Sequence, residues 1–217
     1  MEVILLLGPP GSGKGTLAQH LTQRVPAMRH ISSGDLLRDA IAHGTPAGRQ
    51  AEPIMKSGGL VPDNLVAEMI RDFLRQADPS GTILLDGFPR TTAQAAQLDT
   101  LLAECNVPLR AAILLEVPES ILLDRVTGRR VCPVCKNIHH LTTRPPKVEN
   151  LCDLCRVPLI QRPDDQPTTV LRRLAVYNDA TAGLITLYDR RGLLITLNAD
   201  APPATLAGEI IRLMSKG

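Results

Sequence analysis

The chain has 217 residues, of which 44% are apolar, 21% are charged and 2% are aromatic. These values suit one α/β domain with an aliphatic core and small insertions, and they exclude a disordered chain. The formal net charge of +2 excludes a protein whose whole surface binds nucleic acid, so any polyanion must be bound by a local group of arginines.

Targeting and redox signals favour the cytoplasm. No continuous apolar run reaches the roughly 18 residues that a transmembrane helix needs, so we expect no membrane contact. The apolar start of the chain lacks a basic leader and a small-residue cleavage site, which argues against a secretory signal. Four of the five cysteines form two C-x-x-C pairs, a pattern that favours metal binding in a reducing compartment.

The first predicted elements are a strand, a glycine-rich loop and a helix. Residues 3–7 (VILLL) predict a buried strand, and residues 14–24 predict a helix. Ser32 is placed to cap a second helix, with Asp35 three residues on, and Gly44 ends that helix.

The loop GPPGSGKGT has the spacing of a phosphate-binding loop, with Gly8, Gly13 and Lys14 between a strand and a helix. Its backbone N–H groups and the helix N-terminus attract phosphate, and the lysine adds a full charge. Gly15 stands where the general motif has a Ser or Thr that binds magnesium, and Thr16 follows one residue later. A glycine-rich turn with an incidental lysine is the less favoured alternative.

The middle of the chain continues the alternation of strands and helices. A short helix ends at residues 57–59, and Pro62 opens another that runs to about Gln76. Residues 82–88 (TILLDGF) predict a second strand, and Asp86 lies at its carboxyl edge, where open α/β sheets bind ligands. An acid there commonly holds magnesium in phosphate-loop enzymes, although by itself it could be a turn acid.

The second half completes a parallel sheet covered by helices on both faces. We expect strands at residues 111–115 and 193–197, and helices at residues 91–104, 118–127, 168–188 and 202–214. In the last helix Ala207, Ile210, Ile211 and Met214 share one apolar face.

A cysteine-rich segment interrupts this alternation. Cys132 and Cys135 are followed, after sixteen residues, by Cys152 and Cys155, which is a strong zinc spacing. Four thiolates fill a tetrahedral site, so the metal would be structural and would stabilise an insert too small to bury much core. A disulfide is the alternative, disfavoured in a reducing compartment.

Motifs spread from end to end resemble the adenylate kinase family. They are GPPGSGKGT, ISSGDLLR, GGLVPD, DGFPRTTAQ, DRVTGRRVC and RPDD, and DGFPR with a GKGT loop is highly specific to nucleoside monophosphate kinases. The resemblance implies an α/β fold, a P-loop NTPase-type parallel sheet flanked by helices. It implies a core at residues 1–31, 62–127 and 166–217, a small helical NMP-binding insert at 32–61 and a zinc-ribbon-like lid at 128–165.

The same resemblance implies reversible phosphoryl transfer from Mg·ATP to AMP, giving two ADP, by a monomer. The residues that match ATP-binding positions are Gly11, Ser12, Gly13, Lys14, Gly15, Thr16, Arg125, Arg129, Ile138, His139 and Ala201. The residues that match AMP-binding positions are Ser33, Gly34, Arg38, Leu60, Val61, Pro62, Gly87, Phe88, Pro89, Arg90, Gln94, Arg162 and Arg173. The catalytic set is Lys14, Asp86, Arg90, Arg125, Arg129, Arg162 and Arg173.

Some positions depart from the family pattern. Ser33 replaces a common threonine and keeps the hydroxyl. Lys136 and Arg156 stand where glycine is usual after each C-x-x-C pair. We expect His139 and His140 at the surface of the lid, with His139 near ATP.

Arginines suit a reaction that needs no general base, because the acceptor phosphate is already largely dianionic at neutral pH. Arg110, Arg190 and Arg191 lack motif context and are expected at the surface. Three alternatives remain: a kinase for CMP or UMP, a nucleotide-binding regulator without transfer activity, and a zinc ribbon that binds nucleic acid. The last is disfavoured because the cysteine segment lacks aromatic residues on which bases could stack.

Overall fold

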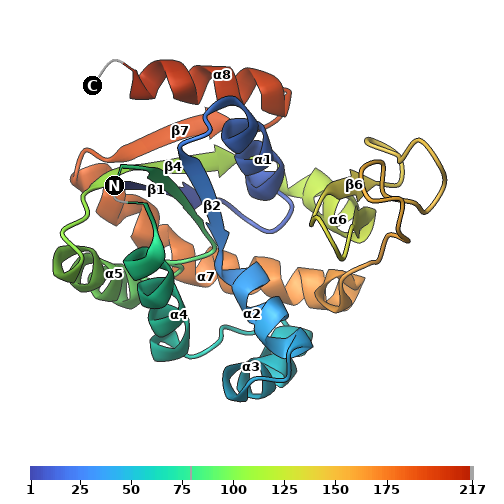
Figure 1. Ribbon diagram of the computed structural model, residues 1–217, viewed down its shortest axis with the longest axis horizontal. Helices are drawn as coiled ribbons and strands as arrows, with labels where there is room; N and C mark the ends of the chain where they lie inside the picture. Colours follow the sequence, from blue (N-terminus) through green and yellow to red (C-terminus); the bar gives the residue numbers. More distant parts are fainter. Residues whose placement is uncertain (79, 216–217) are drawn as a thin grey trace.

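The computed structural model describes residues 1–78 and 80–215 (Figure 1). Its strands are β1 (Glu2–Leu7), β2 (Met28–Ser32), β3 (Thr82–Asp86), β4 (Leu109–Glu116), β5 (Arg129–Val131), β6 (Ile138–His140) and β7 (Leu194–Asn198). Its α-helices are α1 (Lys14–Arg24), α2 (Ser33–Ala42), α3 (Pro46–Ser57), α4 (Asp63–Gln76), α5 (Thr92–Glu104), α6 (Glu119–Thr127), α7 (Pro167–Arg190) and α8 (Pro203–Met214). A 3-10 helix spans Pro163–Asp165.

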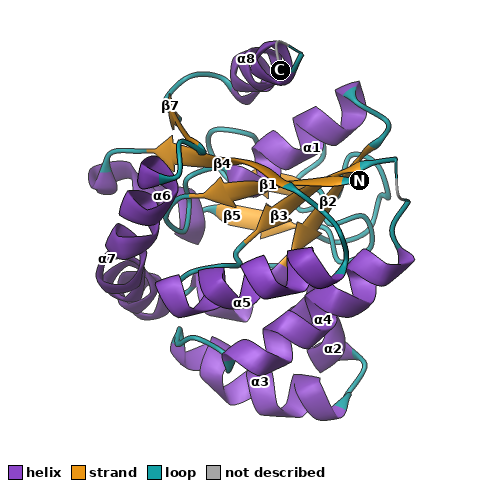
Figure 2. Ribbon diagram, turned by 90° about the vertical axis from the view of Figure 1, so that its left-hand side faces the viewer, coloured by secondary structure: helices purple, strands orange, loops and turns teal. Residues whose placement is uncertain are grey.

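A parallel sheet of five strands, in the order β2-β3-β1-β4-β7, forms the centre (Figure 2). Alternate residues of β1 pack on opposite faces. Ile4 and Leu6 contact the side covered by α1 and α8, whereas Val3 and Leu5 contact the side covered by α4, α5 and α7. Burial on both faces explains the continuous aliphatic runs of the sequence and confirms the predicted sheet.

The register of the sheet brings the chemically important chain segments to one edge. Asp86, the last residue of β3, pairs with Leu6 of β1 and with Ser32 of β2. The phosphate-binding loop (residues 8–16) follows β1, and α2 follows β2, so both begin beside Asp86. The Ser32 hydroxyl accepts a hydrogen bond from Asp35 N at 3.3 Å, which confirms the predicted helix cap.

Three strands are not predicted from the sequence. Strand β2 lies at the edge of the sheet, and only Met28 and Ile31 of its residues are buried, with Arg29 exposed, so it lacks an aliphatic run. Strands β5 and β6 have three residues each and pair antiparallel inside the cysteine segment (residues 128–165). Among the predicted boundaries that differ, β3 ends at Asp86 rather than at Phe88, and Pro62 caps α4 instead of lying in its first turn.

Helices α2 and α3 form a pair below the carboxyl edge of the sheet in Figure 1. Gly48 of α3 lies directly against the backbone of α2, because a Cβ at this position would stand 2.2 Å from the carbonyl oxygen of Ala40. None of the helices within the described residues is long and apolar enough to cross a bilayer.

We predict that Gly48→Ala destabilises the protein by about 2 kcal/mol, because the added methyl group must push α2 and α3 apart. Gly208→Ala is the matched control in α8, where a Cβ would meet no atom closer than 3.6 Å. That control should be neutral or stabilise by about 0.5 kcal/mol, because alanine favours helix more than glycine does. Urea unfolding measures the stability of both variants. Equal unfolding midpoints for Gly48→Ala and wild type would show that α2 and α3 do not pack closely at this position.

Candidate active site

A cavity of about 730 Å³ lies at the carboxyl edge of the sheet. All the residues predicted to bind nucleotide line it except Pro62, which is exposed at the start of α4. The predicted residues that line it are 11–16, Ser33, Gly34, Arg38, Leu60, Val61, 86–90, Gln94, Arg125, Arg129, Ile138, His139, Arg162, Arg173 and Ala201.

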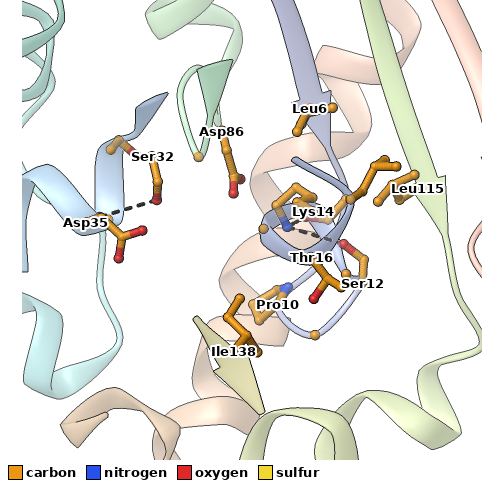
Figure 3. Close-up of a pocket in the computed structure, with 18 of the residues that line it drawn as sticks. Leu6, Pro10, Ser12, Lys14, Thr16, Ser32, Asp35, Asp86, Leu115 and Ile138 are labelled. Atoms are coloured by element: carbon orange, nitrogen blue, oxygen red, sulfur yellow. Dashed lines mark hydrogen bonds between the residues drawn. The ribbon is translucent and has the colours of Figure 1, made fainter. Parts of the chain in front are cut away.

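The phosphate-binding loop curls around the end of Lys14 (Figure 3). The Lys14 ammonium donates to the carbonyl oxygens of Gly8 at 2.7 Å and Pro9 at 3.0 Å, and to the Ser12 hydroxyl at 3.3 Å. Burial lowers the pKa of Lys14 to about 8, although the negative charge of Asp86 opposes this shift. Gly13 caps α1 with a φ of 95°, a conformation that L-residues with side chains rarely adopt.

Figure 3 shows Asp86 and Leu115 of β4 on opposite sides of the phosphate-binding loop. The Asp86 carboxylate points into the same space as the Lys14 side chain. Its Oδ2 is 3.6 Å from Nε2 of His30 on β2. Burial alone would raise the pKa of Asp86, but the charge of Lys14 and the contact with His30 lower it below its ordinary value. The cavity therefore holds an ionised carboxylate beside a lysine.

Two consecutive aspartates of the 3-10 helix lie among the arginines of the cavity. Asp165 is fully buried, and its Oδ2 accepts from Nε of Arg129 at 2.9 Å while its Oδ1 lies 3.5 Å from Arg173. Asp164 contacts Arg173 at 2.9 Å and Arg38 at 3.6 Å. The two carboxylates thus join α2, β5 and α7.

A third aspartate connects α2 with the cysteine segment. Oδ1 of Asp35 accepts from Arg38 at 2.7 Å and from Arg162 at 2.9 Å. Burial and neighbouring guanidinium groups lower the pKa of Arg162 to about 10, and the same two causes lower that of Arg90 to about 10. Cationic charge in this cavity is therefore only partly compensated.

The roles of Asp35, Asp164 and Asp165 are not predicted from the sequence. The last two belong to the RPDD motif, in which the resemblance assigns a role to the arginine alone, and Asp35 is predicted only as a helix-cap partner. The sequence does contain one signal for these roles, which is a pair of adjacent acids beside a motif arginine, because buried arginines require carboxylate partners.

The cysteine segment contacts both the phosphate-binding loop and α2. Lys136 Nζ lies 2.7 Å from Asp39 Oδ1 of α2, and the carbonyl oxygen of Lys136 accepts from Gln19 of α1 at 3.3 Å. Ile138 covers Gly15, where a Cβ would stand 3.2 Å from the isoleucine Cδ1. Glycine in place of the usual Ser or Thr thus allows the segment to approach the loop closely.

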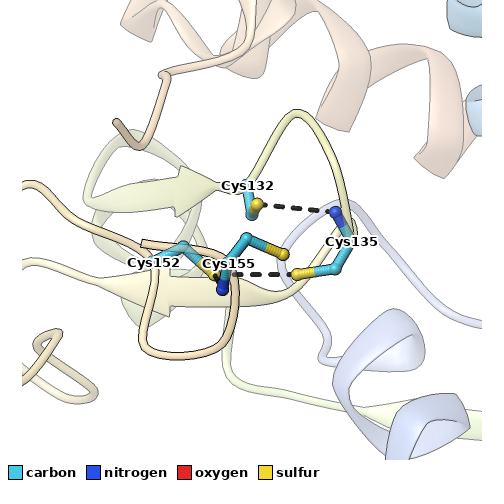
Figure 4. A group of neighbouring side chains, drawn as sticks. All are labelled: Cys132, Cys135, Cys152 and Cys155. Carbon is cyan, nitrogen blue, oxygen red and sulfur yellow. Dashed lines mark hydrogen bonds between the residues drawn. The ribbon is translucent and has the colours of Figure 1, made fainter. Parts of the chain in front are cut away.

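The four predicted metal ligands form one cluster (Figure 4). Their sulfur atoms all lie within 4.8 Å of one another, and Cys135 Sγ is 3.6 Å from Cys152 Sγ. Backbone N–H groups of Cys135 and Cys155 point at the sulfurs of Cys132 and Cys152, at 3.4 and 3.5 Å. Burial would raise the pKa of Cys132, but N–H donors at its sulfur lower it to about 7. The cluster is free of disulfides.

The expectation that His139 and His140 lie at the surface is wrong. They are 1% and 7% exposed, and among the described residues neither belongs to the group of possible metal ligands. His140 Nδ1 accepts from the backbone N–H groups of Thr142 and Thr143, each at 3.2 Å. The ring packs against Gly128, where a Cβ would stand 2.3 Å from its Nε2, so His140 anchors the segment where it leaves α6.

Comparisons with known proteins agree on one family. A family model described as adenylate kinase matches residues 6–193. The chain is 48% identical over 204 residues to an adenylate kinase of Moorella thermoacetica, with 94% of each chain covered. It is 43% identical to an adenylate kinase of Kosmotoga olearia, and the match covers 96% of this chain and 97% of the relative. It is 41% identical to an adenylate kinase of Thermotoga petrophila, and that match covers 99% of this chain and 97% of the relative.

We predict that Asp165→Ala lowers the free energy of unfolding by about 3 kcal/mol or more, because it leaves the buried charge of Arg129 without its main partner. Asp99→Ala is the control, since Asp99 pairs with Arg191 in a more exposed bidentate contact at 2.8 and 3.0 Å. The control should cost less than about 1 kcal/mol. Denaturant unfolding measures both values, and equal losses would show that burial of the first pair is energetically unimportant.

Proposed function

The chain belongs to the adenylate kinase family, and we propose that it catalyses the reversible transfer of a phosphoryl group from Mg·ATP to AMP, giving two ADP. The observation that carries this proposal is the convergence of a phosphate-binding loop and several arginines on one cavity. Two nucleotides bound end to end would place their phosphates between these groups.

We infer that ATP binds on the side of the phosphate-binding loop. The loop N–H groups and the positive end of α1 favour its phosphates, and Lys14 can exchange its loop contacts for phosphate oxygens. Arg125 and Arg129 line the same side, together with Ile138 and His139 of the cysteine segment. A backbone contact at Ala201 would complete the adenine site.

AMP would bind between α2 and the loop after β3. Ser33, Arg38, Arg90 and Gln94 line the cavity and would form this site. Arg162 of the cysteine segment and Arg173 of α7 also line the cavity and would lie between the two nucleotides. AMP would also contact the backbone and nearby side chains of Gly34, residues 60–62 and residues 87–89. Pro62 does not line the cavity and would act only through its neighbours.

The reaction needs no general base. The second pKa of a phosphate monoester is about 6, so the AMP phosphate is a nucleophile without losing a further proton at neutral pH. The barrier lies in bringing two anions together and in stabilising charge on the moving phosphoryl group. Arginines perform both tasks, because the planar guanidinium binds two phosphate oxygens at once and keeps its charge.

Magnesium would bind with ATP and would compensate the negative charge of its phosphates. Asp86 and Thr16 fit this ion, because both line the cavity and offer oxygen ligands, and the lowered pKa of Asp86 keeps its carboxylate ionised. We propose that Asp86, directly or through water, and the Thr16 hydroxyl hold it.

We propose that residues 128–165 act as a lid, residues 32–61 as the NMP-binding insert, and residues 1–31, 62–127 and 166–217 as the core. The contacts of Lys136 and Ile138 described above support a lid that covers the phosphate-binding loop. Covering the cavity would exclude water, which otherwise could accept the phosphoryl group.

A structural zinc ion would make the lid rigid. Zinc–thiolate bonds of about 2.3 Å place tetrahedral sulfurs roughly 3.8 Å apart. The cysteine cluster, with all sulfurs within 4.8 Å and one pair at 3.6 Å, fits this requirement. All four positions would be filled by protein, so the metal would have no place for substrate.

A coupled assay of ADP formation from ATP plus AMP tests the proposed function and separates it from a nucleotide-binding regulator. A panel of monophosphates that includes CMP and UMP tests the acceptor. We further propose a cytoplasmic monomer that binds no nucleic acid, which gel filtration and a salt-dependent RNA-binding assay would examine.

We predict that Arg90→Ala lowers kcat/KM by roughly 10³-fold and leaves the fold intact. Arg90 Nε donates to Gly87 O at 2.8 Å, which holds the guanidinium at the wall of the cavity, where it would bind phosphate. Arg190→Ala, at an exposed position of α7, should retain wild-type kinetics. Near-normal turnover of the Arg90 variant in the coupled assay would remove Arg90 from the catalytic set.

We predict about one zinc ion per chain, which metal analysis of the purified protein measures. Chelation should raise amide hydrogen exchange in residues 128–165 before it affects the central sheet, because the metal supplies most of the lid's stability. Cys132→Ser should lose the metal, whereas Cys105→Ser, outside the cluster, should keep it. Metal-free protein with unchanged melting and exchange would show that the cluster is not a structural zinc site.

A further inference from the structure

Both ends of the Gln94 side-chain amide are held by protein groups. Its Oε1 accepts from the backbone N–H of Arg90 at 2.6 Å, and its Nε2 donates to Oδ1 of Asp63 at 2.7 Å. Gln94 is 3% exposed and lines the cavity, whereas Asp63 is the first residue of α4 and does not line it. Asp63 therefore reaches the cavity through its hydrogen bond to Gln94 rather than by direct contact.

These two bonds fix which end of the amide faces which neighbour. A backbone N–H can only donate, so its partner must be the amide oxygen, and a carboxylate can only accept, so its partner must be the amide nitrogen. Rotating the amide by 180° would set two donors against each other at Arg90 and two acceptors against each other at Asp63. The rotated amide would thus lose two hydrogen bonds, one of them to a charged group.

One N–H and one oxygen lone pair of Gln94 remain, because a side-chain amide has two donors and can accept twice. No other hydrogen bond to this amide is found within residues 1–78 and 80–215. The remaining donor and acceptor belong to one planar amide, and the two bonds fix which end of it donates and which accepts. They complement a base edge that offers an amino group next to an unprotonated ring nitrogen.

We propose that Asp63 is a positioning residue for base selection: it fixes the Gln94 amide so that the acceptor site prefers 6-aminopurine monophosphates over 6-oxopurine monophosphates. This inference rests on the proposed function and specifies its acceptor. Adenine presents an amino donor beside the N1 acceptor, whereas hypoxanthine presents an oxo acceptor beside an N1–H donor. Cytosine has the adenine order and uracil the reverse, so the amide disfavours UMP more than CMP.

The sharpest variant is Asp63→Asn, because it keeps the shape of the side chain. Asparagine can present either its oxygen or its NH₂ group, so rotation of the Gln94 amide toward hypoxanthine then costs only the bond from the backbone N–H of Arg90 instead of both bonds. We expect the ratio of kcat/KM for AMP to that for IMP to fall about tenfold, mainly through a gain with IMP. Asp63→Ala removes the carboxylate altogether and should change the ratio in the same direction.

Asn64→Ala is the matched control, at an exposed position in the same first turn of α4 with no hydrogen bond to Gln94 within the described residues, and it should keep the wild-type ratio. Calorimetric affinities for AMP and IMP, measured without ATP, provide a second readout that does not require transfer. A merely structural role of Asp63 would weaken both nucleotides alike.

The proposal would be overturned if folded Asp63→Asn protein lost kcat/KM equally with AMP and IMP. An unchanged ratio of kcat/KM for AMP to that for IMP would overturn it as well. Wild-type protein that forms no ADP from ATP plus AMP would instead contradict the proposed function. The two failures are distinct, because the first requires an active wild-type enzyme.

Discussion

Repulsion among cationic side chains in a partly desolvated cavity constrains this structure more than any other interaction. Three aspartates share four arginines, which are Arg38, Arg129, Arg162 and Arg173. Without the carboxylates, burying these charges would oppose folding. With an equal number of carboxylates, the cavity would lose its attraction for phosphate. The incomplete match leaves positive charge, and repulsion from Arg173 adds to burial in lowering the pKa of Arg90.

The same aspartates also position separate chain segments. Asp35 of α2 binds Arg162 of the cysteine segment, and Asp164 of that segment binds Arg38 of α2. Because phosphates would compete with these carboxylates for the arginines, nucleotide binding would be coupled to the arrangement of the segments through shared partners. The Lys136 side chain is about half exposed, at 44%, so its pair with Asp39 adds little to this coupling.

Much of this arrangement can be predicted from the sequence, because several motifs are contiguous. The phosphate-binding loop, the acid at the end of β3 and the two C-x-x-C pairs each occupy a short stretch whose chemistry follows from spacing. The aspartate–arginine pairs could not be predicted in this way, since Asp35 and Arg162 are 127 positions apart. The burial of His140 likewise depends on contact with Gly128, which no local pattern reveals.

The turns after the C-x-x-C pairs show how the cysteine cluster and the cysteine segment around it depend on each other. Lys136 and Arg156 have φ values of 59° and 58°, a left-handed conformation that costs about 1–2 kcal/mol for residues with side chains. The exposed ion pair of Lys136 with Asp39 returns at most about 1 kcal/mol, and no salt bridge within the described residues involves Arg156. Ion pairing therefore does not offset the strain of both turns.

The compensation must come from the four sulfurs that the turns bring together, because each turn directs a backbone N–H at a sulfur, at 3.4 and 3.5 Å. The same backbone geometry that strains these residues thus creates the site that would stabilise the segment.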